Sequence, residues 1–264
     1  MNEFKILKII GQAINDYDMI ENNDKIVVGI SGGMDSIFML LFLHKRKKYI
    51  PSNYELFPVI VDNFNGENES YNKKLLELGN FIKEETNLDL KIIPVPAVKY
   101  LTTSDRPRRD TCYLCAQKRR TELFKYANEI GAKKIALGHH KDDIIETTLM
   151  NMFYKRELSS MLPHLPLFGG KMSIIRPLAY LEKSDIETFI YSYPKEIPIF
   201  GEVCPSKIVR RDFRRLEVRN LLEELNEKIP NIKNNIFAAF RNPKIDYLLN
   251  FKFNPKKSGK FKRP

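Results

Sequence analysis

The sequence predicts an α/β protein: a doubly wound parallel sheet followed by a helical C-terminal extension. Short apolar runs typical of buried strands alternate with longer segments of helical periodicity, which implies βαβ units and a parallel sheet. The length of 264 residues and the hydrophobic content of 43% suit one large α/β domain with a small appendage. Two glycine-containing polar turns follow strand candidates, at the sheet edge where such folds bind ligands.

The first half of the chain contains three strand candidates. Residues 4–20 carry an apolar stripe at helical spacing, and the apolar run at 26–30 is typical of a buried parallel strand. A second helix is expected at 35–48, a second strand at 56–61, a helix with a polar face at 67–86 and a third strand at 90–95. Residues 99–110 lack periodicity and are rich in arginine, so we expect a basic loop there.

The second half continues the alternation. Residues 112–130 predict a helix that ends at Gly131, because glycine commonly follows a helix C-terminus. A strand is expected at 134–138, a helix at 142–154 and a last strand at 173–176, before Pro177. The prolines and glycines of residues 156–170 predict a linker. Further helices are expected at 184–192, at 207–225 and, from a weaker pattern, at 231–249.

Charge separates the chain into two predicted regions, a catalytic domain at 1–205 and a basic helical region at 206–264. The formal net charge is +11, and a strongly basic chain favours a polyanionic partner such as RNA. The alternative is a general lysine-rich composition. In the C-terminal region, the tail from Lys252 holds six basic residues and no acid, and the helix candidate at 207–225 is rich in arginine. We expect both to contact the phosphates of a polyanionic partner, the alternative being a solvated basic face.

The first candidate site is the turn at residues 31–36, between a strand and a helix. Its backbone N–H groups and the helix N-terminus predict a polyanion site, with Gly32 and Gly33 allowing phosphate oxygens to approach closely. The hydroxyls of Ser31 and Ser36 can donate further hydrogen bonds. Asp35 would repel phosphate unless Mg²⁺ lies between them. The alternative is an ordinary tight turn with Asp35 as the helix cap.

A second candidate site lies at residues 138–143, again between a strand and a helix. Gly138 ends the predicted strand, His139 is a candidate nucleotide-binding residue, and Asp142 is a candidate base or metal ligand. A polar loop with a capping aspartate is the alternative. Asp62 ends another predicted strand, where it can contact the ribose or adenine or be a solvated loop acid.

The third candidate site is formed by the three cysteines. Cys112 and Cys115 have the C-x-x-C spacing, and Cys204 lies far downstream. With Arg119, the first two fall on one face of the predicted helix. The spacing alone leaves redox, zinc and iron–sulfur roles open, as well as three free core cysteines. Structural zinc needs four ligands, so a zinc site would need a histidine or an acid besides the cysteines.

The first turn resembles the PP-loop, S-G-G-x-D-S, of the ATP pyrophosphatase superfamily, whose members are described as adenine nucleotide alpha hydrolase-like. The resemblance implies that the loop holds the pyrophosphate end of ATP while the α-phosphorus is attacked, so that the substrate is adenylated. Many members carry lysine where this chain has Met34. Another cation must then substitute, or phosphate affinity is lower.

Three further blocks resemble the TtcA group of tRNA 2-thiocytidine synthetases, and with the PP-loop they cover roughly residues 24–205. They read Cys-Tyr-Leu-Cys-Ala-Gln-Lys-Arg-Arg, Lys-Ile-Ala-Leu-Gly-His-His-Lys-Asp-Asp-Ile-Ile-Glu-Thr and Ile-Arg-Pro-Leu-Ala-Tyr-Leu-Glu-Lys-Ser-Asp-Ile-Glu. The resemblance implies ATP-dependent thiolation of a tRNA cytidine at C2, with a [4Fe–4S] cluster on three cysteines. The region around Cys204 has one cysteine where the group often shows C-x-x-C.

Carried over residue by residue, the resemblance assigns three sets of site residues. The cluster ligands are Cys112, Cys115 and Cys204; the ATP and Mg²⁺ site is Ser31, Gly32, Gly33, Asp35, Ser36, Asp62, Gly138 and His139; and the catalytic candidates are Asp35, Arg119 and Asp142. The alternatives from the residues are a tRNA lysidine synthetase-like ligase, which shares the loop but needs no cysteine triad, and an RNA-binding protein with structural zinc.

Partners and location follow from the same reading. We expect tRNA and a sulfur donor, sulfide or a cysteine desulfurase, as partners, and a homodimer is compatible with the sequence. The chain lacks an apolar run long enough to span a bilayer, and its N-terminus lacks a signal-peptide pattern, so we expect a cytoplasmic protein. An odd number of cysteines in that compartment makes a disulfide framework improbable.

Overall fold

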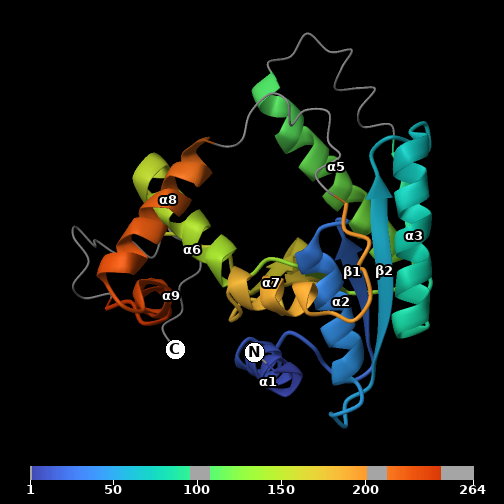
Figure 1. Ribbon diagram of the computed structural model, residues 1–264, viewed down its shortest axis with the longest axis horizontal. Coiled ribbons are helices and arrows are strands. Elements are labelled where there is room, and N and C mark those ends of the chain that lie inside the picture. Colours follow the sequence, from blue (N-terminus) through green and yellow to red (C-terminus); the bar gives the residue numbers. More distant parts are fainter. Residues whose placement is uncertain (1, 96–107, 201–212, 245–264) are drawn as a thin grey trace.

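A six-stranded, mostly parallel sheet organises the chain (Figure 1). The structure is a computed structural model that describes residues 2–95, 108–200 and 213–244, with the backbone alone at 108–115. The strand order is β3-β2-β1-β4-β6-β5. The strands are β1 (Asp24–Ile30), β2 (Tyr54–Asp62), β3 (Lys91–Pro94), β4 (Lys134–Leu137), β5 (His164–Leu167) and β6 (Met172–Ile175). The predicted α/β fold is therefore confirmed.

Helices connect the strands and extend beyond them. They are α1 (Glu3–Asp16), α2 (Met34–Arg46), α3 (Glu69–Thr86), α5 (Arg108–Glu129), α6 (Lys141–Met150), α7 (Lys183–Tyr191), α8 (Phe213–Lys228) and α9 (Ile232–Arg241). A π-helical turn η1 (Asn151–Lys155) follows α6, and a 3₁₀ turn η2 (Phe168–Gly170) follows β5. The predicted loop 99–110 falls partly outside the described residues, as do residues 207–212 and 245–249 of the last two predicted helices.

Three sequence expectations are corrected. The predicted linker at 156–170 contains β5, which pairs antiparallel with β6. Its four residues include Pro166, which lacks an N–H and is tolerated at a sheet edge, so the usual strand pattern is missing. The helix expected to run to Tyr154 changes to a π-helical turn after Met150. Helix α5 begins at Arg108, before Cys112.

The two faces of the sheet bury different helices. Along β1, Ile26 and Val28 lie in a cluster with residues of α1, α2, α3 and α7, whereas Val27 lies in a second cluster with residues of α5. This alternation arises because successive strand side chains point to opposite faces. Every residue of β1 from Ile26 to Ile30 is buried, as expected for a central strand covered on both sides. The carboxyl ends of the strands are thereby fixed relative to the helices that follow them.

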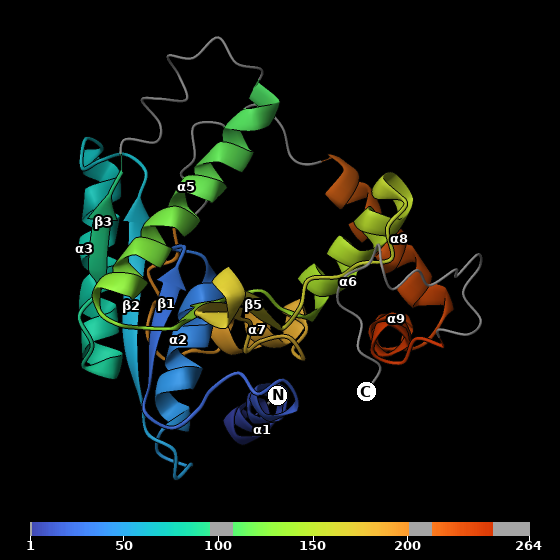
Figure 2. The ribbon, with the colours of Figure 1, turned by 180° about the vertical axis from the view of Figure 1, so that it is seen from behind.

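Helices α6, α8 and α9 form a separate small core on one side of the molecule (Figure 2). Ile145 and Leu149 of α6 pack against Val218 and Leu222 of α8, and Phe237 of α9 joins them. Phe237 also meets Tyr180 edge-on, with ring centroids 5.7 Å apart, so α9 contacts the chain just before α7. Within the described ranges no helix is both long and apolar enough to cross a membrane.

Candidate active site

The turn between β1 and α2 is held by the side chains of its own serines. The Ser36 hydroxyl donates to the Gly33 carbonyl (2.9 Å), and the Ser31 N–H donates to the Ser36 oxygen (3.1 Å). Gly33 is the N-cap of α2, so the first N–H groups of this helix have no acceptor within the helix. These amides, together with the positive end of the helix, favour an anion here.

Gly32 is needed because an aromatic ring covers it. Its φ is +80°, and an added Cβ would overlap the ring of Phe200. The Phe200 N–H donates to the Gly32 carbonyl (2.8 Å), and its ring meets Tyr71 at a centroid distance of 5.4 Å. The segment after α7 is therefore anchored on the turn between β1 and α2.

The second predicted turn lies directly against the first. Strands β1 and β4 are parallel neighbours, with Gly29 opposite Leu137. A Cβ added to Gly138 would lie 3.0 Å from both the Asp35 carbonyl carbon and the Ser36 nitrogen. Because β1 and β4 are neighbours, the two predicted turns lie side by side at the carboxyl ends of their strands.

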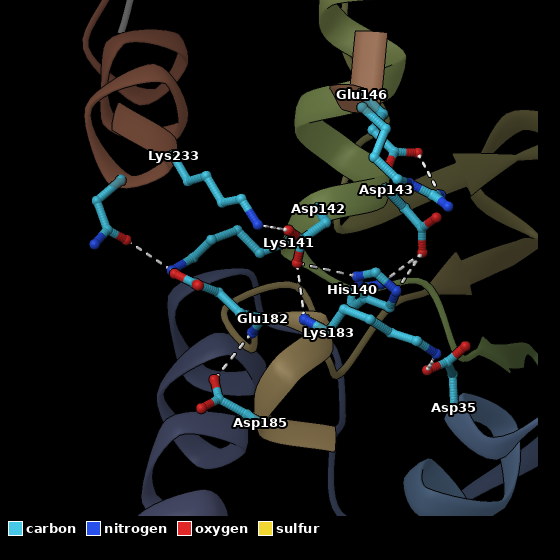
Figure 3. Close-up of polar contacts among 12 residues, drawn as sticks. Asp35, His140, Lys141, Asp142, Asp143, Glu146, Glu182, Lys183, Asp185 and Lys233 are labelled. Carbon is cyan, nitrogen blue, oxygen red and sulfur yellow. Dashed lines mark hydrogen bonds and ion pairs between the residues drawn. The ribbon is translucent and has the colours of Figure 1, made fainter. Parts of the chain in front are cut away.

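Lys183, at the start of α7, extends to Asp35 in the turn between β1 and α2 (Figure 3). Its Nζ lies 2.5 Å from Asp35 Oδ1, and both side chains are about one-third exposed, at 32% and 30%. Its backbone N–H donates to Asp142 Oδ2 (2.8 Å). Lys183 therefore links the turn after β1 to the helix that follows β4.

Asp142 is buried and its carboxylate is fully engaged. Besides the Lys183 N–H, it pairs with Lys233 Nζ of α9 (2.6 Å) and lies 3.5 Å from His140 Nδ1. Burial alone would raise the pKa of Asp142, but these three partners lower it well below the usual range. Asp142 is consequently ionised near neutral pH and is poorly suited to accept a proton there.

The two adjacent histidines have opposite electrostatic environments. Burial and the charge of Arg176 lower the pKa of His139 to about 4, and its buried Nδ1 has no hydrogen-bond partner among the described residues. Burial also acts to lower the pKa of His140, but Asp142, Asp143 and Asp35 together raise it above its ordinary value. His139 is thus a neutral imidazole near pH 7, which suits contact with an uncharged heterocycle.

Asp62 ends β2, and Arg119 of α5 lies close enough to Tyr71 of α3 for its charge to act on that residue. Asp62 is buried and accepts hydrogen bonds from the N–H groups of Phe64 (2.8 Å) and Gly66 (2.7 Å), so it shapes the loop after β2. Burial and the Asp62 charge raise the pKa of Tyr71 to about 12, whereas the Arg119 charge acts to lower it. The structure thus brings Arg119 of α5 near the same loop.

The predicted cluster ligands fall outside the described side chains. Cys112 and Cys115 lie on the described backbone of α5, one helical turn apart, and Cys204 lies four residues after Phe200. Elsewhere in the described part of the chain, no group of three or more His, Cys, Asp or Glu side chains is placed to hold a metal ion.

Several arginines of α8 make contacts within the protein. Glu146, only 2% exposed, accepts a hydrogen bond from Arg219 Nε on one oxygen (2.8 Å) and forms an ion pair with Arg215 through the other, 2.9 Å from Nε. Arg214 stacks over Tyr154, 5.0 Å from the ring centroid. These arginines hold α8 on α6 and η1. These contacts do not test the prediction that the helix binds tRNA, and residues 207–212 of the predicted helix lie outside the described ranges.

Sequence reasoning missed several residues of the crevice. Lys183 belongs to the third block that resembles the TtcA group, but its partner Asp35 lies 148 positions away in the sequence, so the pairing could not be predicted. Arg176 is buried at the end of β6, where its guanidinium donates to the Leu162 carbonyl; burial, followed by the charge of Arg120, lowers its pKa to about 10. Phe200 and Lys233 had no recognisable sequence signal.

The fold and the site define a PP-loop protein. Residues 3–195 match the family described as "PP-loop domain". Among solved structures, the U34-tRNA thiolase NcsA from Methanococcus maripaludis, described with its [4Fe-4S] cluster, is similar at a TM-score of 0.67, with 22% identity over 90% of this chain and 80% of that one. The NH3-dependent NAD synthetase from Campylobacter jejuni has a TM-score of 0.51 and 14% identity, covering 100% of this chain and 99% of that one.

Curated relatives narrow the family further. The tRNA-cytidine(32) 2-sulfurtransferase of Marinomonas sp. is 36% identical over 90% of this chain and 82% of its own length. That of Syntrophotalea carbinolica is 35% identical over 93% of this chain and 91% of its own length. The chain belongs to the tRNA-cytidine(32) 2-sulfurtransferase family.

Proposed function

We propose that this chain is an ATP-dependent tRNA sulfurtransferase that replaces the C2 oxygen of a cytidine with sulfur, at position 32 as in the names of its relatives. The observation that carries the proposal is the pairing of a phosphate-binding turn and a second polar turn in one crevice, within a chain 36% identical to such enzymes. The runner-up enzyme, a lysidine synthetase-like ligase, finds no support among these relatives.

The proposed reaction has two steps. In the first, the C2 carbonyl oxygen of the cytidine attacks the α-phosphorus of ATP, and pyrophosphate leaves with the electrons of the broken P–O bond. In the second, a sulfide attacks C2, and the C–O bond breaks so that AMP leaves with the former carbonyl oxygen. Atoms balance with one sulfide consumed for each ATP, and no net oxidation occurs. Sulfide supplied as such satisfies this balance. Sulfur supplied by a cysteine desulfurase arrives as a persulfide, and a thiol reductant must then give up two electrons and become a disulfide to bring that sulfur to the sulfide level.

The described residues fit the pyrophosphate end of ATP. Gly33 and the first amides of α2 provide donors, and Gly138 leaves no side chain between the two turns. Asp35 is partly exposed at this helix N-terminus, where a carboxylate can hold Mg²⁺ against phosphate oxygens. His139, neutral and with a free Nδ1, is proposed to face the base or ribose, while Asp62 positions the adjoining loop.

The cysteines are proposed to hold a [4Fe–4S] cluster. Cys112 and Cys115 share one face of α5, the helix that also carries Arg119 near the crevice. Cys204 follows the anchored Phe200 by four residues, a span of at most about 14 Å of extended chain. When bound through three cysteines, such a cluster keeps one iron open to a sulfur ligand. The cluster named for NcsA supports this assignment.

Arg119 and Asp142 remain proposed catalytic residues with different roles. Arg119 supplies positive charge beside the crevice, suited to the negative charge that develops during adenylation. Asp142, because of its lowered pKa, is proposed to orient Lys183 and His140 rather than to remove a proton. Basic residues of 206–264 are proposed to contact tRNA phosphates, which fixes orientation without reading sequence.

Metal analysis of anaerobically purified protein tests the cluster assignment. We expect iron and acid-labile sulfide together with broad visible absorbance, all lost in each of Cys112→Ala, Cys115→Ala and Cys204→Ala, while ATP binding persists. Zinc in place of iron would favour a structural metal in an RNA-binding protein, and protein that thiolates tRNA without any metal would refute the cluster. A full cluster in Cys204→Ala would refute that ligand.

A further inference from the structure

The phosphate-binding turn contains no basic residue of its own. Residues 31–36 read Ser-Gly-Gly-Met-Asp-Ser, and the Met34 side chain packs against the main hydrophobic core. ATP brings three phosphates with about four negative charges at neutral pH, and Asp35 adds another. Helix amides and one Mg²⁺ offset only part of this charge. A cation from elsewhere in the fold is therefore needed at the N-terminus of α2.

Three lysines surround the crevice, and their contacts distinguish them (Figure 3). Lys233 is paired with the buried Asp142 (2.6 Å). Lys141 is paired with Glu182 (3.2 Å) and the amide oxygen of Asn234 (2.7 Å), on the side of α9. Lys183 alone of the three extends to Asp35, at the first turn of α2. It is the lysine of this group that faces the phosphate-binding turn.

The backbone of Lys183 is held by hydrogen bonds, whereas its side chain is partly exposed. Its backbone N–H is bound to Asp142, and the N-cap Glu182 N–H is bound to Asp185 Oδ2 (3.1 Å), so the first turn of α7 is rigid. The side chain is 32% exposed, which leaves it free to exchange one anionic partner for another. The Lys183 ammonium contacts the Asp35 carboxylate, next to the position proposed for Mg²⁺ and the phosphate oxygens.

We propose that Lys183 is the phosphate-binding cation of this site, supplied from α7 in place of a basic residue in the turn. With Mg·ATP bound, Asp35 contacts the metal and the Lys183 ammonium transfers to a β- or γ-phosphate oxygen. This inference rests on the proposed function, because it deepens the ATP site. It implies that Lys183 is a binding residue for the pyrophosphate portion of the nucleotide and makes no contribution to the adenosine portion.

Ligand dissection by calorimetry tests this assignment without tRNA or sulfur. The dissociation constants of ATP, pyrophosphate and AMP are measured with Mg²⁺ for wild type and Lys183→Met. Loss of one charge-assisted contact predicts weakening of ATP and pyrophosphate binding by roughly 10- to 100-fold, with AMP changed less than about twofold. Lys183→Arg, which keeps the charge, should stay near wild type.

Control variants separate this effect from misfolding. Lys195 lies beyond the end of α7, is 53% exposed and pairs with Glu84 and Glu85 of α3. Lys195→Met should therefore leave the dissociation constants of ATP, pyrophosphate and AMP unchanged. Met34→Lys in the Lys183→Met background should recover pyrophosphate binding, because it restores a cation at the same helix N-terminus. Thermal unfolding of each variant is measured alongside, and Lys183→Gln replaces Lys183→Met if the latter unfolds.

The outcomes separate the inference from the proposed function. A variant that loses AMP binding as strongly as ATP binding, or retains wild-type affinity for ATP and pyrophosphate, overturns the role of Lys183 and leaves the site intact. A wild-type chain that binds neither ATP nor pyrophosphate instead refutes the proposed nucleotide site.

Discussion

Replacing Gly138 by alanine should damage the nucleotide site through backbone contact alone. The new Cβ would meet the Asp35 carbonyl carbon and the Ser36 nitrogen at 3.0 Å, and the Asp35 oxygen at 3.1 Å. These distances are tighter than ordinary van der Waals contact, so one of the two turns must shift by a few tenths of an ångström. Because both partners are backbone atoms between central strands and a buried helix, overpacking should cost about 1–3 kcal/mol of unfolding free energy.

The shift falls on the amides that are proposed to bind phosphate. A displacement of α2 at its N-terminus should therefore raise the dissociation constant of ATP about tenfold, equivalent to 1.4 kcal/mol. Gly79→Ala is the matched control, because its Cβ would come no closer than 4.0 Å to Leu90 and alanine favours the helix interior of α3. We expect that control to be unchanged in ATP binding and slightly more stable. A Gly138→Ala protein with wild-type stability and ATP affinity would refute the close approach of the two turns.

Three further predictions concern charged groups, two of them in the site and one in the C-terminal tail. Asp142→Asn should lower the unfolding free energy by about 2 kcal/mol at pH 7, because the ionised carboxylate has three partners in the folded state. Since folding lowers the pKa of Asp142, this difference should persist at every pH above the unfolded-state pKa of about 3.9 and shrink as the pH falls below it. A difference in stability that does not change with pH would contradict this prediction. In an NMR titration, His139 should change charge near pH 4 and His140 above pH 6.5; one shared midpoint would refute the assigned environments. Deleting residues 252–264 should weaken tRNA binding and flatten its salt dependence while ATP binding is retained, whereas an unchanged salt slope would exclude the tail from the interface.

Local patterns were sufficient to predict five of the six strands of the described sheet and the two turns after β1 and β4. The apolar run ending at Ile30 and the following glycines specify a buried strand and a phosphate-binding turn within ten residues. The alternation of elements predicted a parallel sheet but not its strand order, and the pairing of β1 with β4 is what brings Gly138 against the turn at residues 31–36. Strand β5 was missed because Pro166 and its edge position remove the signals by which strands are recognised.

Long-range contacts were beyond the reach of these patterns. Lys183 meets Asp35 and Lys233 meets Asp142 across 148 and 91 positions, and a lysine at a helix start looks the same whether it is solvated or placed in a site. The role of Asp142 as a base or metal ligand stays a prediction, but the tertiary contacts that lower its pKa had no sequence signal. Arg215 and Arg219, which are expected at an RNA surface, also pair with the buried Glu146, a contact that has no recognisable signal in the sequence.

The central claim is that the chain uses ATP to place sulfur on a tRNA cytidine. The most direct measurement incubates the anaerobically purified protein with tRNA, Mg·ATP and sulfide, digests the RNA to nucleosides and identifies them by mass spectrometry, with nucleotide products analysed in parallel. We predict 2-thiocytidine and an equal amount of AMP, both dependent on ATP and on all three cysteines. An unmodified tRNA under these conditions, or ADP and phosphate in place of AMP and pyrophosphate, would contradict the account.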